Sequence, residues 1–242
     1  MILPQIRSTF ERKHGRMLAD LIGRDDPELL RAAHDRLDEE GLDALLDDPR
    51  ALNALLTEGD VPLPPSVVFY VMVRQGLLEK GIDDRATADY VATLLFAFGE
   101  GNRAYRISQD AGEEYHYLVD LLQGMGQAEG REAFLLRSHL GNYSLWLTGL
   151  FPDYLESRER RRGAPGIRYY EELGSSGFRL ASETREARRL GMEEVLREVG
   201  VGFREVRSAL NRISDRHIWK GGANAVGRLL RQVQEGGPFS RS

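Results

Sequence analysis

The sequence of 242 residues contains no cysteine. This absence excludes disulfide bonds, zinc–thiolate sites, iron–sulfur clusters and cysteine nucleophiles. Lysine is scarce as well, because it occurs only at Lys13, Lys80 and Lys220 while arginine supplies the other 30 of the 33 positive charges. Arginine suits the recognition of phosphate and carboxylate groups, although a GC-rich genome gives the same bias without any functional cause.

Long apolar runs are missing too. The best candidate, Leu140 to Phe151, is shorter than the roughly 18 residues that a membrane span requires, and it contains Asn142 and Ser144. The first seven residues hold no apolar run of signal-peptide length. We therefore expect a soluble, cytoplasmic protein with no membrane span, and nothing in the sequence calls for a cofactor.

What the sequence does contain is helical periodicity along most of its length. It predicts an all-α protein, a multi-helix bundle of about ten helices around a central antiparallel helical hairpin. The hairpin consists of helices at about 112–123 and 129–150, joined by a turn with three glycines. On the wheel of the second helix, Leu136, Tyr143 and Trp146 belong to one apolar arc that also includes His139. The opposite stripe is small and polar, which allows close helix approach and predicts a helix covered on both faces.

Charge divides the chain unevenly. Residues 1–60 carry 14 acidic and 8 basic side chains, whereas residues 201–242 carry 3 acidic and 8 basic ones. We expect an acidic helical front section at 1–60 docked on a main helical bundle at 61–235, followed by a flexible tail at 236–242. The split indicates either an acidic–basic contact within the molecule or a basic tail that binds a partner.

The local structure of three further segments is predicted as follows. Residues 5–22 have the spacing of one helix. Residues 66–73 are rich in valine and aromatics, as a strand would be, but no partner strand follows and we predict a buried helix. Residues 167–190 look helical but are interrupted by Gly174-Ser-Ser-Gly177, which is either a kink or a close-packing face.

The central hairpin also holds the best ligand candidates. Glu113 and His116 form a Glu-x-x-His pair on one helix face, the spacing used by carboxylate-bridged metal sites in helical bundles. A di-iron site needs a second such pair, which the sequence lacks, so no metal site is favoured. The ordinary alternative is that His116 lies on the surface and His139 is a core histidine bonded to a carbonyl. The candidate ligand-binding set is Glu113, His116, Arg137, His139, Tyr143 and Trp146.

Arg212-Ile-Ser-Asp-Arg-His217 matches an Arg-x4-His pattern. These six residues resemble the ribonuclease motif of the HEPN helical domains, a family whose resemblance would imply RNA cleavage by Arg212 and His217. The residue after the arginine is usually polar in that family and is Ile213 here. On a regular helix the two side chains lie about 140° apart, so such a site would have to be completed across a dimer.

Two basic segments, 158–168 and 204–220, are the candidates for binding nucleic acid or another polyanion. Tyr169, Tyr170 and Trp219 lie close enough in sequence to stack on bases. Interleaved glutamates are equally typical of a solvated helix face. The candidate polyanion-binding residues are Arg158, Arg160, Arg161, Arg162, Arg168, Arg204, Arg207, Arg216 and Lys220.

Three functions follow from these patterns. The leading hypothesis is a non-catalytic interaction or scaffold protein with a protein partner, self-associating through an apolar helix face. The alternative is nucleic-acid or polyanion binding through the Arg-rich second half. The third is a metal- or ligand-binding protein or enzyme that uses Glu113, His116 and His139. No nucleophile–base pattern is present, and we predict no catalytic residue.

Overall fold

The computed structural model of the protein describes residues 5–57, 63–99 and 118–217, and every regular element in these ranges is a helix. The predicted all-α multi-helix fold is therefore confirmed. The elements are η1 (Ile6–Thr9), α1 (Arg12–Ile22), α2 (Pro27–Glu39), α3 (Leu42–Leu46), α4 (Pro49–Thr57), α5 (Pro65–Leu78), α6 (Arg85–Gly99), α7 (Leu118–Met125), α8 (Gly130–Leu150), α9 (Pro152–Arg162), α10 (Ile167–Ser182), α11 (Arg185–Arg189), α12 (Glu193–Val201) and α13 (Phe203–His217).

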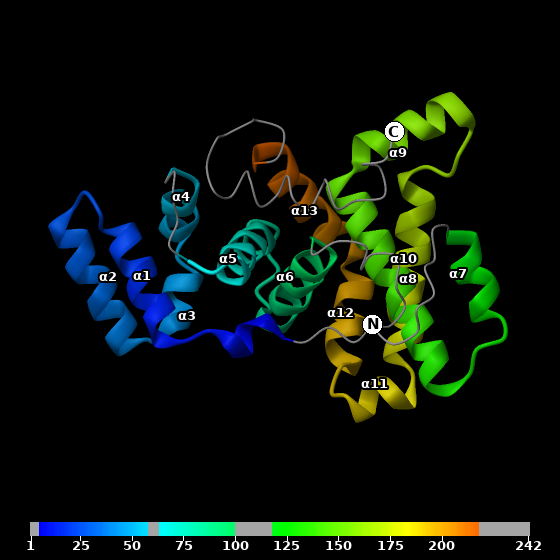
Figure 1. The fold of residues 1–242 in the computed structure, drawn as a ribbon, viewed down its shortest axis with the longest axis horizontal. Helices are drawn as coiled ribbons and strands as arrows, with labels where there is room; N and C mark the ends of the chain where they lie inside the picture. Colours follow the sequence, from blue (N-terminus) through cyan, green and yellow to red (C-terminus); the bar gives the residue numbers. More distant parts are fainter. Residues whose placement is uncertain (1–4, 58–62, 100–117, 218–242) are drawn as a thin grey trace.

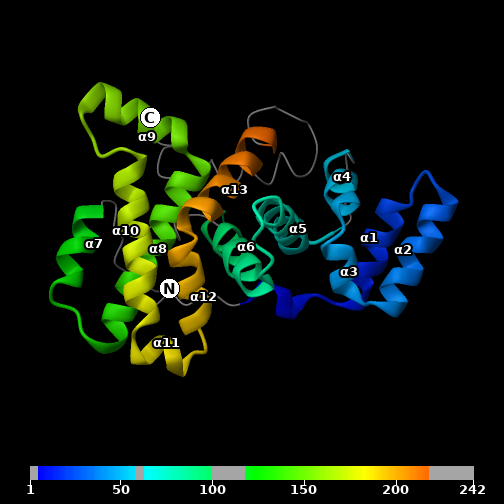
Figure 2. The ribbon, with the colours of Figure 1, turned by 180° about the vertical axis from the view of Figure 1, so that it is seen from behind.

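The helices are arranged along one long axis. Helices α1 to α4 form one end, α5 and α6 lie in the middle, and α7 to α12 form the other end, while α13 runs from that end toward the middle and packs on both α8 and α5 (Figures 1 and 2). A single cluster of buried apolar side chains runs through all three parts, from Ile6 to Ile213. None of the helices named above combines the length and apolar composition that crossing a membrane would require.

Helix α5 resolves the choice between strand and helix at 66–73. Pro65 occupies its first turn, where the missing N–H costs no hydrogen bond. All residues from Val67 to Leu77 are buried. A helix covered on every side needs no polar face, so its sequence reads as one apolar run. The prediction of a buried helix is confirmed.

The predicted helix at 5–22 is wrong in one respect, because it is divided. Phe10 and Glu11 have extended backbone between η1 and α1. Glu11 caps α1 in a reciprocal box: its side chain accepts from the backbone N–H of His14, and its own N–H donates to His14 Nδ1 at 3.0 Å. Because a histidine replaces the usual Glu or Gln of a capping box, the sequence pattern did not reveal this helix start.

Helix α8 is the central helix, as predicted, and its most extensive helix contact is with α10 rather than with its hairpin partner α7. The stretch Gly174–Gly177 does not interrupt α10, which continues through it. A Cβ added at Gly177 would lie 2.9 Å from the carbonyl oxygen of Arg137 and 3.0 Å from the backbone nitrogen of Gly141. These glycines form the close-packing face between the two helices.

An alternating network of ion pairs joins the front of the chain to the middle. Arg74 of α5 is 1% exposed and binds Asp47 at 2.6 Å and also Asp83. Arg85 of α6 binds the same Asp47 at 2.7 Å, and Asp43 at 3.6 Å. Helix α3 and its C-terminal residue are thus held on α5 and α6 by charge as well as by apolar contact.

The proposed boundary between a front section at 1–60 and a main bundle at 61–235 falls at residues outside the described ranges. Side chains on both sides of it, Leu45 and Leu55 before and Val67 and Leu77 after, belong to the same buried cluster. The division into a docked front section and a main bundle stays a prediction, and the tail at 236–242 also lies outside the described residues.

Acid is expected to destabilise this part of the fold. Burial is the largest single influence and raises the pKa of Asp47 and of Asp48. It is outweighed at Asp47 by the combined hydrogen bonds and charges of Arg74 and Arg85, and at Asp48 by those of Arg50 with the charge of Arg36, so both pKa values lie below normal. Because these pKa values are lower in the folded state, the stabilisation is complete above about pH 4 and is lost as the pH falls through the folded values. Urea unfolding at pH 7 and pH 3 should show this fall. The fall should be smaller in Asp48→Asn, and an equal fall in both proteins would contradict the assignment.

Candidate functional site

The predicted ligand-binding residues on α8 lie in the core. His139 and Trp146 are fully buried and Tyr143 is 7% exposed. The His139 ring stacks on Tyr143 with centroids 6.4 Å apart, and Trp146 meets Phe151 edge to face at 4.9 Å. This is an aromatic packing cluster, and none of its members lines either of the two cavities described below.

The other predicted ligand residues are dispersed. Arg137 is half-buried, donates to the carbonyl of Leu180 at 3.4 Å, and lies on a different face of α8 from the aromatic cluster. Glu113 and His116 lie outside the described residues. Within the described ranges, no group of three His, Asp or Glu side chains is placed to hold a metal ion.

The predicted polyanion residues do not gather into one site. Arg207 is used within the fold, since it pairs with Glu171 at 2.5 Å and donates to Asn211. Arg158 lies over the Tyr154 ring at 5.5 Å. Arg160 turns back to the carbonyl of Glu156 at 3.4 Å. Exposed members of the set are Arg160, Arg161, Arg168 and Arg204; the side chains of Arg162 and Arg216, and all of Lys220, lie outside the described residues.

The two residues of the Arg-x4-His pattern are also not seen together. Arg212 of α13 binds Glu79 at the end of α5 at 2.9 Å, so its guanidinium joins two helices. The side chain of His217 is not among those described. The ion pair that Arg212 forms with Glu79 holds α13 against the end of α5.

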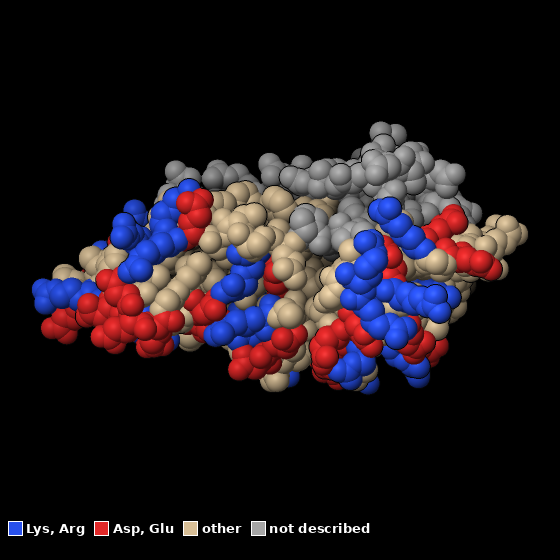
Figure 3. Space-filling model, turned by 90° about the horizontal axis from the view of Figure 1, so that it is seen from below, with Lys and Arg blue, Asp and Glu red and all other residues tan. Residues whose placement is uncertain are grey.

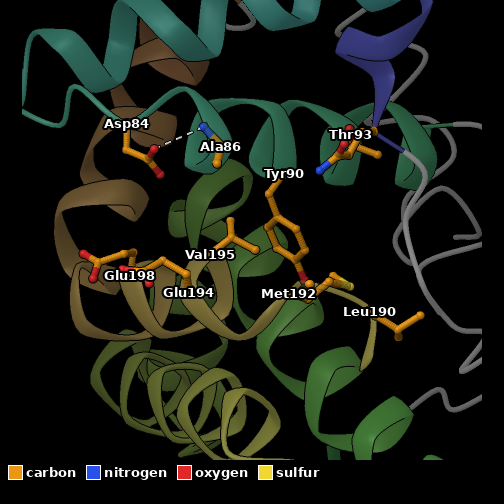
Figure 4. Close-up of a pocket in the computed structure, with 11 residues that line it drawn as sticks. Asp84, Ala86, Tyr90, Thr93, Leu190, Met192, Glu194, Val195 and Glu198 are labelled. Carbon is orange, nitrogen blue, oxygen red and sulfur yellow. Dashed lines mark hydrogen bonds between the residues drawn. The ribbon is translucent and has the colours of Figure 1, made fainter. Parts of the chain in front are cut away.

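The feature that sequence reasoning missed is a cavity of about 510 Å³ between α6 and the α11–α12 region. Figure 4 shows its two walls: Asp84, Ala86, Tyr90 and Thr93 come from the start and body of α6, and the facing wall comes from α12 and the turn before it. That turn is possible because Gly191 has φ +66°, which ends α11 and lets the N–H of Met192 bond to the carbonyl of Ala187 at 2.9 Å. The facing residues are Leu190, Gly191, Met192, Glu194, Val195 and Glu198.

One end of the cavity is acidic. Asp84 accepts from the backbone N–H groups of Ala86 at 3.2 Å and Thr87 at 2.8 Å, so it caps α6. Burial raises the Asp84 pKa, but the hydrogen bonds from Thr87 and Ala86 and the charge of Arg74 together outweigh it, and the pKa lies below its ordinary value. Glu194 and Glu198 lie across from Asp84 in Figure 4 and share one cation, Arg197, at 2.6 and 3.1 Å. Arg74 also acts on Asp84, so three carboxylates stand against the two guanidinium groups of Arg197 and Arg74, which leaves this end negative.

The other end is apolar. The ring of Tyr90 extends across the cavity toward Met192, with Val195 beside it and Leu190 beyond (Figure 4). The Tyr90 hydroxyl donates to Asn142 Oδ1 at 2.7 Å, and burial raises its pKa, so the phenol stays neutral. Thr93 Oγ1 accepts the N–H of Ile6 at 3.2 Å. Both hydroxyls therefore have protein partners, and the wall presents mainly carbon to an occupant.

Comparisons with protein-family models, with curated proteins and with solved structures find no match to this chain. The class of protein is therefore defined by its architecture: an all-helical protein with a concave site between α6 and α12. No single signal in the sequence marks this cavity, because its residues come from segments about a hundred positions apart and each has an ordinary side chain for an amphipathic helix.

Proposed function

We propose that the protein is a non-catalytic helical binding protein whose cavity between α6 and α12 takes a compact ligand with an apolar body and a positively charged end. The observation that carries this proposal is the two-ended character of the cavity. Asp84, Glu194 and Glu198 supply the negative end, while Tyr90 and Met192 belong to the apolar end. An amine-bearing molecule complements both.

Size and chemistry support binding by such a ligand. Small-molecule sites typically enclose about 300–1,000 Å³ and are mostly apolar, with a few placed polar groups, and a cavity of about 510 Å³ falls in this range. The hydroxyls of Tyr90 and Thr93 are already hydrogen-bonded within the protein. They are poorly suited to act as nucleophiles, which favours binding over catalysis.

Self-association through an apolar helix face remains a prediction. In the described part of the chain, the large apolar side chains with substantial exposure are Tyr169, Leu180 and Val201. A stable dimer commonly buries about 800 Å² on each partner, far more than three such side chains cover. The cavity is the better supported binding surface.

The proposal is tested by calorimetry with three ligands that share one body: 2-phenylethylamine, 2-phenylethanol and 3-phenylpropionate. We expect the amine to bind at least about tenfold more tightly than the acid, which is about 1.4 kcal/mol. Val195→Trp should abolish binding by filling the cavity, whereas Val201→Trp, an exposed change on the same helix, should not.

The charged end of the cavity is tested by a matched pair of variants. Glu198→Gln removes a carboxylate from the cavity and should weaken amine binding several-fold, while Glu193→Gln removes one from α12 outside the lining. Equal binding of the amine and the acid, or equal losses in the two glutamine variants, would contradict the proposed function.

A further inference from the structure

A second cavity lies at the start of α11, where this helix meets the start of α8, whereas the first cavity is lined by the residues that follow α11. The second cavity has a volume of about 410 Å³. Arg131 and Arg137 enter it from α8, and Arg185 enters it from the first position of α11. From below, a group of Lys and Arg side chains is visible at the end of the molecule where α11 and the start of α8 lie, with Asp and Glu side chains beside it (Figure 3).

The three arginines of this cavity are not used by the fold in the way that Arg74 or Arg207 is. Neither Arg131 nor Arg185 forms an ion pair or hydrogen bond with any side chain of the described residues, and Arg137 makes only a long bond of 3.4 Å to the carbonyl of Leu180. By contrast, Arg74 and Arg207 each bind a carboxylate directly. Three guanidinium groups thus keep their donors for an occupant.

Two carboxylates also line the cavity, and they do not neutralise it. Glu186 is held by Arg189 through two bonds of 2.6 and 3.0 Å, and these hydrogen bonds lower the Glu186 pKa, with a smaller contribution from Arg131. Glu129 is exposed at the rim. Because Glu186 is held mainly by Arg189, the three arginines of the lining outnumber the carboxylate charge left to them, which is Glu129 and part of that of Glu186.

We propose that this cavity is an anion site for a compact phosphate-bearing small molecule, separate from the amine cavity between α6 and α12. Arginine presents a planar fork of donors that matches phosphate oxygens bidentately. A concave site with arginines from two helices suits a compact terminal phosphate. A long polyanion would instead contact the exposed arginines around the cavity, including Arg188 and Arg189. The set differs from the basic runs at 158–168 and 204–220, because it combines two arginines of α8 with one of α11.

The test uses inorganic pyrophosphate as the probe, measured by calorimetry with the full chain at constant ionic strength. We expect saturable binding at one site. Arg185→Gln and Arg131→Gln should each weaken it about tenfold or more, since hydrogen bonds to a charged group are strong. Both residues are exposed, so the variants should fold, and unchanged thermal unfolding without ligand checks this.

The matched control is Arg188→Gln. Arg188 is an exposed arginine of α11 that does not line the cavity and donates to the carbonyl of Glu183. The Arg188→Gln variant loses the same charge from the same short helix as Arg185→Gln, and its affinity for pyrophosphate should stay within about twofold of that of the unchanged protein. A comparable loss in Arg188→Gln would show attraction to the whole basic surface, as a polymer such as single-stranded RNA would experience, and would overturn the cavity site. Binding unaffected by Arg185→Gln and Arg131→Gln would overturn it as well.

Discussion

Replacing Asp47 with alanine is expected to lower the free energy of unfolding by about 3–5 kcal/mol, the cost of leaving a buried charge without its partner. Asp47 binds both Arg74 and Arg85, and Arg74 is 1% exposed. Without Asp47, the buried guanidinium keeps only Asp83, whose side chain is 76% exposed. Urea unfolding at pH 7 measures the change.

Replacing the other partner of the ion pair, Arg74, should lower the free energy of unfolding by less. Arg74→Met removes the buried charge itself and fills its volume with an apolar side chain, while Asp47 keeps Arg85 and Asp83 keeps access to water. Asp38→Ala is the surface control, because the Asp38–Arg12 pair is more than half exposed and such pairs contribute about 1 kcal/mol or less. If Asp47→Ala costs no more than Asp38→Ala, the network does not hold α3 on α5 and α6.

The second large effect is expected at the contact between α8 and α10. Gly177→Val should destabilise the protein by about 3 kcal/mol, near the upper end for overpacking. The added atoms would meet the backbone of Arg137 and Gly141, and those atoms can move only if the whole of α8 moves. A gain in helix propensity of about 0.5 kcal/mol on replacing glycine is too small to offset this.

Ser176→Val is the matched control, since Ser176 precedes Gly177 on α10 and is exposed. It introduces the same β-branched side chain into the same turn and should change the unfolding free energy by about 0.5 kcal/mol or less. Similar thermal midpoints for the two variants would mean that α8 and α10 are not in close backbone contact.

Most helices of the fold can be predicted from local sequence patterns, but the contacts between helices cannot. The apolar arc and the small polar stripe of α8 predicted a helix covered on both faces, and every residue from Ser138 to Leu150 is buried. The small polar stripe did not predict, however, which helix packs against it. Gly141 and Ser144 meet Phe178, Gly174 and Gly177 of α10, and this pairing depends on how distant helices turn toward one another.

The candidate sites were harder to predict, for a physical reason. His139 stood out in the sequence because it lies on an apolar arc, and the structure places it fully buried in an aromatic cluster, in agreement with the core-histidine alternative. The two cavities use ordinary residues such as Val195 and Arg185, whose role comes from space left between helices. Basic runs drew attention to 158–168, whereas the arginines that share a cavity come from two segments about fifty positions apart.

The central claim is that the cavity between α6 and α12 binds the apolar body of an amine. Methyl-¹³C labelling of the five methionines tests it most directly, because Met192 lines this cavity while Met72 is buried in α5 away from it. Titration with 2-phenylethylamine should shift the Met192 methyl resonance, with contacts from the phenyl protons, and leave Met72 unchanged. Saturable binding of the amine without any change at Met192 would contradict the account.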